Sequence, residues 1–387
     1  MFGTLFIKEC KAILKSTTYY LFLACLVLFF VGQMESNTGI AKPQKDQASY
    51  GYQYSKDPKV IMQYSIDILL QEFESETYIT YPFGFYKEVH PSKSKQSKIE
   101  AIISEVLDEN YDIKEDISYE QFEAKMEKID DILGGGSRYK ASGLKSNAYI
   151  PMTYEDAMKD YEDILYNDKI SGAYARLFCD YMGIVLAILP VFLAVTRGLR
   201  DKRAKAFDVI FSKKASSIAI VMSRYLATVS MVVIPVILLS ISPALQSLYS
   251  AVNNGIKGDA FAYLRYIGGW LLPTIMITIS VGFFLTELTN GPIAILVQGL
   301  WWYISMFMGA ESLVGTVGYN IMPRFNTIGE HEVYKAILPQ LVRNRLFYSG
   351  MGILLIIATI VVYHYKRKGA LNYHGKIFKH RKSELEI

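Results

Sequence analysis

Residues 217–245 read SIAIVMSRYLATVSMVVIPVILLSISPAL, an apolar run in which Arg224 is the single charged residue. About 20 apolar residues are enough to cross the hydrocarbon core of a bilayer as a helix. Similar runs recur along the chain. They are too long for the strands of a closed barrel, the other structure that satisfies every peptide group in lipid. The sequence therefore predicts an all-α polytopic membrane protein.

The composition of the whole chain agrees with a membrane protein. Hydrophobic residues make up 51% of the 387 residues and charged residues 20%, whereas a soluble chain usually carries about 25% charged residues. The three cysteines lie in or beside apolar runs, so the long polar segment after the first run has no disulfide framework. The N-terminus lacks the short basic start and the cleavage site of a secretory signal, and we expect it to be retained as a first span.

We expect six transmembrane helices. They cover residues 17–34, 173–196, 217–245, 262–288, 291–308 and 346–365. The other segments are an interfacial amphipathic helix at 1–16, a large polar domain at 35–172, a basic segment at 197–216, a second outer segment at 309–344 and a basic tail at 366–387. Only TNGP, a turn sequence at 289–292, separates the fourth and fifth helices, which should form a tight hairpin.

The distribution of charge predicts the orientation. Six spans place both termini on one side of the membrane, together with residues 197–216, in which seven of twenty residues are Lys or Arg. Lys and Arg are enriched in cytoplasmic segments. Residues 35–171 carry 26 acidic and 16 basic residues, while the rest of the chain carries 11 acidic and 25 basic residues. We therefore expect a plasma-membrane protein with cytoplasmic termini and an extracellular, mainly helical domain between the first and second spans.

The extracellular segment contains helical patterns at 60–76, 97–109 and 118–134. Ser118 with Gln121 and Thr153 with Asp156 form two capping boxes. The second should open a helix that runs straight into the second span. Many tyrosines are interleaved here, and both readings stay open for them: packing in a core, or an aromatic surface that contacts a peptide or lipid. The sequence interleaves, among others, Tyr50, Tyr52, Tyr54, Tyr78, Tyr81 and Tyr86.

The first sixteen residues form an amphipathic pattern. Lys8, Lys11 and Lys15 are three or four residues apart and share one face of a helix, with Phe2 and Phe6 on the opposite face. This pattern is typical of a helix that lies in the membrane interface. A frayed basic tail is the alternative.

The chain shows no arrangement for catalysis. It has no phosphate-binding GxxxxGK[ST] loop, no HExxH and no CxxC, and no nucleophile stands beside a base. Glu330, His331 and Glu332 are adjacent, so they would point in different directions on a helix and make a poor metal cage. We expect no catalytic residue, metal or cofactor on this chain.

Ionisable residues inside a bilayer are candidates for function. Arg176 and Asp180 are one helical turn apart near the outer end of the second span and should pair within that helix. Arg224 and Glu287 both lie toward the cytoplasmic face and should approach each other. The spans contain no series of carboxylates, which disfavours an ion-coupled transporter.

Taken in order, these features resemble the ABC-2-type permeases, the membrane subunits of a class of ATP-binding-cassette exporters. The quoted segments are KECKAILKSTTYY before and into the first span, the large outer domain, RDKRAKAFDVIFSKKASS between the second and third spans, SRYLA in the third span, and NRLFY and YKRKG around the sixth. The ordered set carries the resemblance, since no single motif is strict.

The resemblance implies that residues 197–216 contain a coupling helix that docks on a separate ATP-binding subunit, which would hold ATP and Mg²⁺. The implied apolar contacts are Leu199, Phe207, Ile210 and Phe211, and the implied charged contacts are Arg200, Lys202, Arg203, Lys205 and Asp208. Members of the family often have an acidic residue followed by Gly-Thr in this segment. This chain has Lys205-Ala206-Phe207-Asp208 instead, so the register stays open by one or two positions. The alternative is that the basic residues only fix the topology.

The resemblance also implies a second permease chain, identical or related, and a hydrophobic or amphipathic substrate such as a lipid, peptide or antimicrobial compound. It implies no bond chemistry on this chain and no nucleic-acid partner. In similar permeases the segment that corresponds to 309–344 forms short helices that dip back into the outer leaflet. Two other functions stay open, a membrane sensor whose outer domain binds a ligand and an ion-coupled transporter.

Overall fold

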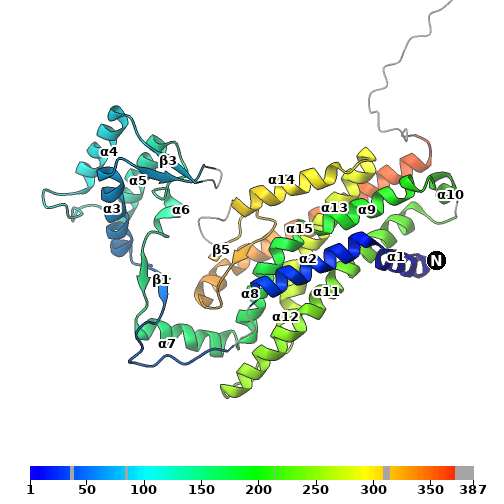
Figure 1. Cartoon of the computed structure of the whole chain (residues 1–387), viewed down its shortest axis with the longest axis horizontal. Coiled ribbons are helices and arrows are strands. Elements are labelled where there is room, and N and C mark those ends of the chain that lie inside the picture. Colours follow the sequence, from blue (N-terminus) through cyan, green and yellow to red (C-terminus); the bar gives the residue numbers. More distant parts are fainter. Residues whose placement is uncertain (35–38, 83–85, 213, 308–313, 371–387) are drawn as a thin grey trace, which may run out of the picture. The chain divides into compact units, whose positions relative to one another are not determined.

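The computed structural model describes residues 1–34, 39–82, 86–212, 214–307 and 314–370 (Figure 1). The chain divides into two compact units. One unit, called the bundle here, comprises Met1–Ile40, Ile164–Met306 and Val314–Ile387. The other, called the polar unit, comprises Ala41–Asp163 and Phe307–Leu313. Each unit has its own packing and is described by itself.

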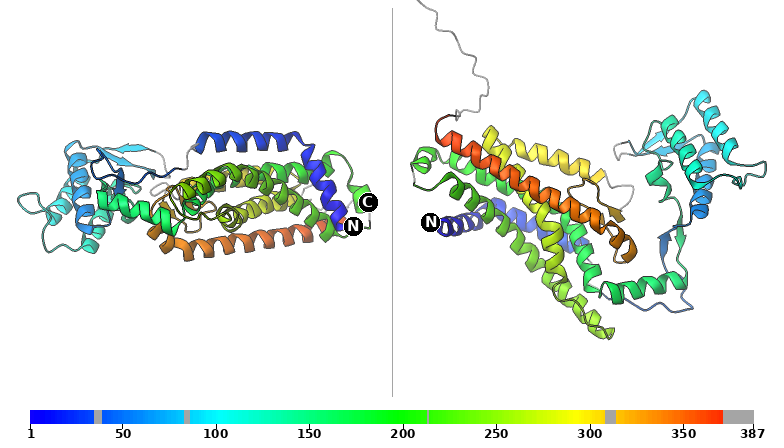
Figure 2. Two further views of the ribbon diagram at one scale, coloured as in Figure 1. Left: turned by 90° about the horizontal axis from the view of Figure 1, so that it is seen from below. Right: turned by 180° about the vertical axis from the view of Figure 1, so that it is seen from behind.

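The bundle contains four helices that are long and apolar enough to cross a membrane, among the described residues: Ser171–Arg203, Ser217–Asn253, Ala262–Thr289 and His331–Arg367. Helices α1 (Phe2–Leu14) and α2 (Thr17–Gln33) would together make a fifth, but they meet at a bend of 69°. Helix α14 (Ile293–Phe307) is apolar and shorter, with 15 residues. The long helices lie side by side, as the two views of Figure 2 show. The prediction of an all-α membrane protein agrees with this architecture.

The second predicted span is two helices, α8 (Ser171–Leu186) and α9 (Pro190–Arg203). Pro190 begins α9 because a proline in the first turn of a helix lacks an N–H that would be unpaired anyway. The carbonyl of Ala187, in the break, accepts hydrogen bonds from Gln298 Nε2 at 2.6 Å and Thr278 Oγ1 at 3.3 Å. Side chains of neighbouring helices thus satisfy the backbone where the apolar span is interrupted.

Helices α11 (Ser217–Asn253), α13 (Leu272–Thr289) and α15 (His331–Arg367) supply the rest of the bundle core. Helix α12 (Ala262–Tyr266) and the π-helix η3 (Ile267–Leu271) precede α13 without a break. Helix α13 ends at Thr289, and Asn290 adopts a left-handed conformation with a φ of 52°. Because α14 begins at Ile293, the TNGP sequence forms the turn that its residues predict.

The region of 309–344 differs from the short re-entrant helices that the family resemblance implies. Residues 308–313 lie outside the described residues. Strands β5 (Val314–Thr316) and β6 (Arg324–Phe325) then form an antiparallel pair. The following helix begins at His331, fifteen residues before the predicted start of the sixth span. Asp180 fixes β6 in an extended conformation, because its Oδ1 accepts a hydrogen bond from the backbone N–H of Phe325 at 2.6 Å.

The polar unit is mainly helical, with two small antiparallel sheets. Its helices are α3 (Pro58–Glu74), α4 (Lys93–Val106), α5 (Tyr119–Leu133), α6 (Ala141–Leu144) and α7 (Tyr154–Glu162). Strand β1 (Tyr52–Tyr54) pairs with β4 (Tyr149–Pro151), and β2 (Tyr78–Thr80) pairs with β3 (Lys87–Val89). Both predicted capping boxes are confirmed, at Ser118 and at Thr153.

A buried cluster holds the polar unit together. The core lies between α3, α4 and α5 and is fully buried at Ile66, Leu69, Ile99, Phe122 and Met126, among others. Glu72 lies at the edge of this cluster, where its Oε2 accepts a hydrogen bond from Tyr139 Oη at 2.5 Å. Burial raises the pKa of the Glu72 carboxyl above its usual value. Apolar packing, without disulfides among the described cysteines, therefore stabilises this unit.

The tyrosines of the polar unit divide between buried and exposed positions. Tyr78 is fully buried in the core. Tyr52, Tyr54 and Tyr149 are exposed and lie together on the β1–β4 pair, with the ring of Tyr149 centred 5.3 Å from Tyr52 and 4.9 Å from Tyr54. Core packing therefore explains only part of the tyrosine content.

The predicted straight helix from Thr153 into the second span is wrong. The helix continues from α7 only as a π-helix, η2 (Asp163–Asn167). Lys169 and Ile170 then adopt positive φ angles of 53° and 59°. A right-handed helix cannot contain residues in this conformation, so α8 starts anew at Ser171.

Small residues allow α9 and α13 to approach closely. A Cβ atom placed on Gly282 of α13 would lie 2.5 Å from the Cβ of Ala194 of α9, and one placed on Gly198 would lie 2.8 Å from Thr286 Cγ2. Ala194 and Gly198, like Gly282 and Thr286, are four residues apart on one face of their helix. Such small-xxx-small pairs are typical of helix contacts in membranes.

We predict that Gly282→Leu separates α9 from α13 and destabilises the bundle by about 1–3 kcal/mol, the usual cost of overpacking. Gly299→Leu on α14 is the matched control, because a Cβ at Gly299 meets no atom within 4 Å. The measurement is the temperature at which the detergent-purified protein loses its monodisperse elution peak. Equal temperatures for the two variants would contradict the close packing.

Candidate functional site

Residues 197–216, called the basic elbow here, connect α9 to α11. Helix α9 continues to Arg203, seven residues beyond the predicted end of the second span. Lys205 has a positive φ of 50°, a short helix α10 (Phe207–Phe211) follows, and the Ser216 hydroxyl accepts a hydrogen bond from the N–H of Ala219 at the start of α11. Lys213 lies outside the described residues. The elbow is therefore a turned, hydrogen-bonded structure over its described part.

The basic elbow lies at the same end of the bundle as the other basic flanks of the chain. Lys202 Nζ donates to the carbonyl of Asn290, just after α13. Arg367, at the end of α15, donates from Nε to the carbonyl of Phe211 at 3.1 Å. Helix α1 also packs at this end, against α11 (Figure 1). Residues 371–387, the rest of the predicted basic tail, lie outside the described residues.

A buried charge network joins the elbow to α1 and α11. Arg197 Nε and Nη2 donate to the two carboxylate oxygens of Glu9 at 2.5 Å and 2.6 Å, and its Nη1 donates to Asp201 Oδ1 at 3.2 Å. Arg224 of α11 pairs with Asp201, and its Nε lies 3.9 Å from Glu9 Oε1. The two positive charges of the guanidinium groups are thus matched by the two negative charges of the carboxylates in a largely buried site. Buried charges are tolerated where such pairing is complete.

The predicted pair of Arg224 with Glu287 is not formed. Glu287 Oε1 lies 3.2 Å from Lys366 Nζ, and the same amine donates to Asn290 Oδ1 at 2.7 Å. Arg224 turns to Asp201 instead, because the extension of α9 past residue 196 brings this carboxylate beside α11. The two residues belong to separate ion pairs at the same end of the bundle.

The predicted apolar contacts of the elbow point into the bundle where their side chains are described. Leu199 is 7% exposed and packs with Val191 and Val195. Ile210 and Phe211 pack against a cluster that includes Tyr363. These three side chains anchor the elbow to the bundle, Leu199 as a buried residue and Ile210 and Phe211 as partly buried ones. Phe207 and Asp208 lie outside the described side chains.

The exposed surface of the elbow is mainly basic over its described side chains. Arg200, Lys202, Arg203 and Lys205 are exposed, and Lys202 has the partner described above. Val209 is 60% exposed. Val209 is thus the exposed apolar position among the described side chains of α10, and the register of the docking contacts stays a prediction.

Helix α1 presents its three lysines to solvent. Lys8, Lys11 and Lys15 are exposed along one helix, as the spacing predicts. Ile13 is buried, and Leu5 packs on the cluster of α11 and α15 beside the elbow. Sequence reasoning missed Glu9. The signal that could have found it is a single acid among the lysines of KECK.

At the other end of the bundle, the predicted pair of Arg176 with Asp180 is wrong. Arg176 donates through Nη1 and Nη2 to both carboxylate oxygens of Asp168, at 2.5 Å and 2.6 Å. Asp180 accepts from Arg324 Nε at 2.9 Å and Nη2 at 3.1 Å. His331 Nδ1 lies 3.0 Å from Asp168 Oδ1. A spacing of one turn permits a pair, but Arg324 of β6 meets Asp180, and Asp168, just before α8, meets Arg176.

The described residues contain no group of three His, Cys, Asp or Glu side chains that could hold a metal ion. Comparison of the chain with family models, with characterised proteins and with solved structures gives no significant match. The resemblance to ABC-2-type permeases therefore rests on the ordered sequence features alone, and the function that follows from it is a proposal.

We predict that Glu9→Gln releases α1 from the bundle. The substitution leaves two buried guanidinium groups with one carboxylate, and removal of one partner of a buried pair costs about 3–5 kcal/mol. Hydrogen exchange of the α1 amides should accelerate at least about tenfold. Lys8→Gln changes the charge by the same amount at an exposed neighbouring position and should leave exchange unchanged. Slow exchange in the Glu9→Gln protein would show that the network does not hold α1.

Proposed function

We propose that this chain is the permease subunit of an ATP-binding-cassette exporter. The single observation that carries the proposal is the basic elbow: a structured, cationic turn between two membrane-length helices, anchored inside the bundle and free on its outer surface. A segment that only fixed topology would need the charge but not Leu199, Ile210 and Phe211 as anchors.

In this proposal the bundle crosses the plasma membrane six times. The spans are α2, the α8–α9 pair, α11, the helix from α12 to α13, α14 and α15. Their connections put both termini and the elbow on one side, and the excess of Lys and Arg at that end makes it the cytoplasmic side. The acidic polar unit is then extracellular. Helix α1 lies along the inner interface, with its lysines near anionic lipid headgroups.

The elbow would receive force from the ATP-binding subunit. Arg200, Arg203 and Lys205 would pair with acidic residues of that subunit, and Val209 would fill an apolar contact. Arg197 and Asp201 lie on α9, the helix that also carries Arg200 and Arg203, and they bind α1 and α11. A displacement of the elbow is therefore transmitted to three helices at once, because ion pairs of a buried network move together.

ATP and Mg²⁺ would be held by the partner subunit, and this chain would catalyse no bond chemistry. Its own residues would form half of a translocation path, completed by a second permease chain that is identical or related. The substrate class that suits an apolar path and a large outer domain is a hydrophobic or amphipathic compound: a lipid, a peptide or an antimicrobial compound.

We predict that the elbow is labelled only from the cytoplasm. Lys205→Cys and Lys257→Cys are introduced separately into a chain in which Cys10, Cys25 and Cys179 are replaced by Ser. Both lysines are exposed and lie near opposite ends of α11. A membrane-impermeant maleimide should modify the Lys257→Cys protein in intact cells and the Lys205→Cys protein only after the membrane is opened. Labelling of Lys205→Cys from outside would overturn the topology.

We predict that the combined variant Arg200→Glu, Arg203→Glu and Val209→Asp loses its ATP-binding subunit. The chain is co-expressed with each ATP-binding protein that its neighbouring genes encode, and the recovered partner and its ATP hydrolysis are measured in detergent. Recovery should fall at least about tenfold, since charged and apolar contacts at the centre of an interface carry most of its affinity. The control carries Lys257→Glu and Val252→Asp, two exposed positions at the other end of α11. A complex that survives the elbow variant would place the docking surface elsewhere.

A further inference from the structure

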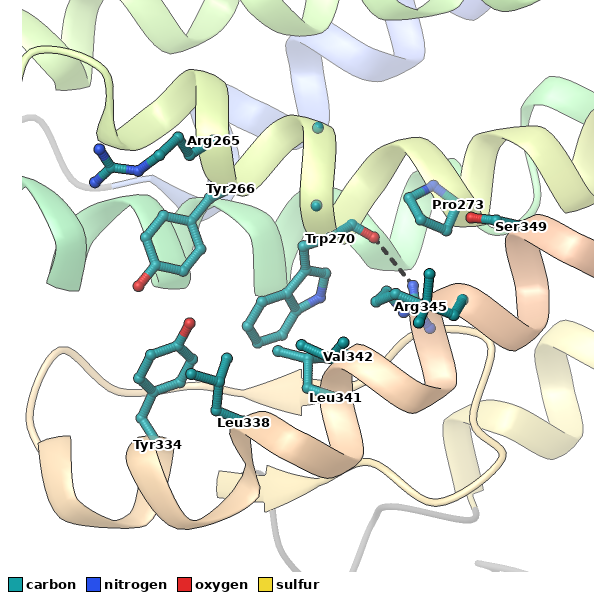
Figure 3. Close-up of a pocket in the computed structure, with 13 residues that line it drawn as sticks. Arg265, Tyr266, Trp270, Pro273, Tyr334, Leu338, Leu341, Val342, Arg345 and Ser349 are labelled. Carbon is teal, nitrogen blue, oxygen red and sulfur yellow. Dashed lines mark hydrogen bonds between the residues drawn. The ribbon is translucent and has the colours of Figure 1, made fainter.

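A groove lies between α15 and the wall formed by η3 and the start of α13. It has a volume of about 470 Å³ and is lined by aromatic and aliphatic side chains, including Tyr266, Trp270, Tyr334, Leu338 and Val342 (Figure 3). Gly268 and Gly269 of η3 also line it, and a Cβ on either would meet no atom within 4 Å. A π-helical turn such as η3 is frequent at functional sites.

The groove opens on an exposed side of two membrane-length helices, a side that would meet lipid in a bilayer. Its walls belong to Ala262–Thr289 and His331–Arg367, both of which are long and apolar enough to cross a bilayer. Leu338, Val342 and Leu346 at its edge are exposed. The molecule that has direct access to an apolar groove at this position is a membrane lipid.

Trp270 brings an unpaired donor into the groove. The side chain is 2% exposed, yet its Nε1 has no hydrogen-bond partner among the described residues. Figure 3 shows the indole between Tyr266 and Arg345, with its nitrogen on the side of Arg345. A buried donor without an acceptor costs about 1–3 kcal/mol, and a ligand oxygen in the groove would remove this cost.

Arg345 brings an unbalanced positive charge to the same place. It is 5% exposed, and all its hydrogen bonds go to uncharged oxygens. The acceptors are the carbonyls of Trp270, Asn320 and Ile321, Thr274 Oγ1 and Asn344 Oδ1. Arg345 takes part in none of the ion pairs of the described residues. By contrast, a carboxylate faces each of the buried arginines Arg176, Arg197, Arg224 and Arg324.

The charge of the groove selects the kind of lipid. Its lining includes two arginines, Arg265 and Arg345, and no acidic residue. Arg265 is exposed and pairs with Asp259, so the unbalanced charge is that of Arg345. A net-negative headgroup would lower the electrostatic cost of this buried cation. A zwitterionic headgroup would bring an ammonium that finds no carboxylate in the lining.

We propose that this groove is a binding site for an anionic phospholipid of the phosphatidylglycerol type. A phosphate oxygen accepts the Trp270 Nε1–H and lies in the field of Arg345, and an acyl chain follows Leu338, Val342 and Leu346 toward the bilayer. Arg345 acts through its fixed charge, because its N–H groups already have acceptors. The site does not depend on the transport role proposed above.

The test is native mass spectrometry of the full-length protein in detergent, titrated with phosphatidylglycerol or phosphatidylcholine of the same acyl chains. We expect one phosphatidylglycerol per chain to bind about tenfold more tightly than phosphatidylcholine. Trp270→Phe keeps the ring and removes the donor, and should weaken phosphatidylglycerol binding about fivefold, the effect of one hydrogen bond. Gly269→Leu should fill the groove and abolish the preference. Gly350→Leu, at an exposed glycine of α15 outside the groove, should change nothing.

Four results would overturn the proposal. Equal binding of the two lipids would mean that the charge of Arg345 does not select the headgroup. An unchanged preference in both Trp270→Phe and Gly269→Leu, with the fold intact by elution profile, would put the lipid elsewhere. Displacement of the lipid by inorganic phosphate alone would make the groove a site for a free anion. Arg345→Gln should lose the preference for phosphatidylglycerol, and its retention would contradict the role of the cation.

Discussion

A helix that crosses a membrane has no water to satisfy its polar groups, so each of them needs a partner inside the protein. This constraint explains most of the specific contacts of the bundle. The interrupted span of α8 and α9 is possible because Gln298 and Thr278 reach the carbonyl of Ala187. The buried charged residues of α8, α9 and α11 are tolerated because an opposite charge meets each of them. Trp270 is among the exceptions, because its buried Nε1–H has no acceptor in the described residues, and the charge of Arg345 faces no carboxylate there.

The charges are sorted to the two ends of the bundle. At one end Arg197, Asp201 and Arg224 join Glu9 in a balanced cluster, and Lys366 joins Glu287. At the other end Arg176 faces Asp168 and Arg324 faces Asp180. Between them the helices pack through small residues such as Gly282 and Gly198. Ion pairs thus connect the helices at both ends of the bundle, and small residues allow α9 and α13 to pack closely.

The basic elbow combines two properties that a docking surface needs. Its inward side chains hold it to the bundle. In the proposed function, a partner that displaces the elbow would therefore displace helices of the bundle and would not only unfold a loop. Its outward side chains form a compact cationic surface around one exposed valine. The proposal of an ATP-driven permease rests on this combination together with the order of the sequence features, while the lipid groove rests on separate observations at α15.

The sequence by itself determined the features that depend on neighbouring residues. The apolar runs, the turn at TNGP, the capping boxes at Ser118 and Thr153 and the basic character of the elbow all follow from local pattern, because hydrophobic burial and helix capping act over a few residues. Tertiary structure alone decided the ion pairs. Arg197 and Glu9 are 188 residues apart, and Asp180 and Arg324 are 144 residues apart. Spacing within one helix shows which side chains can meet, as Arg197 and Asp201 do, but a buried charge pairs with the opposite charges that packing brings closest, and for Arg197, Arg224 and Asp180 these include a residue on another segment of the chain.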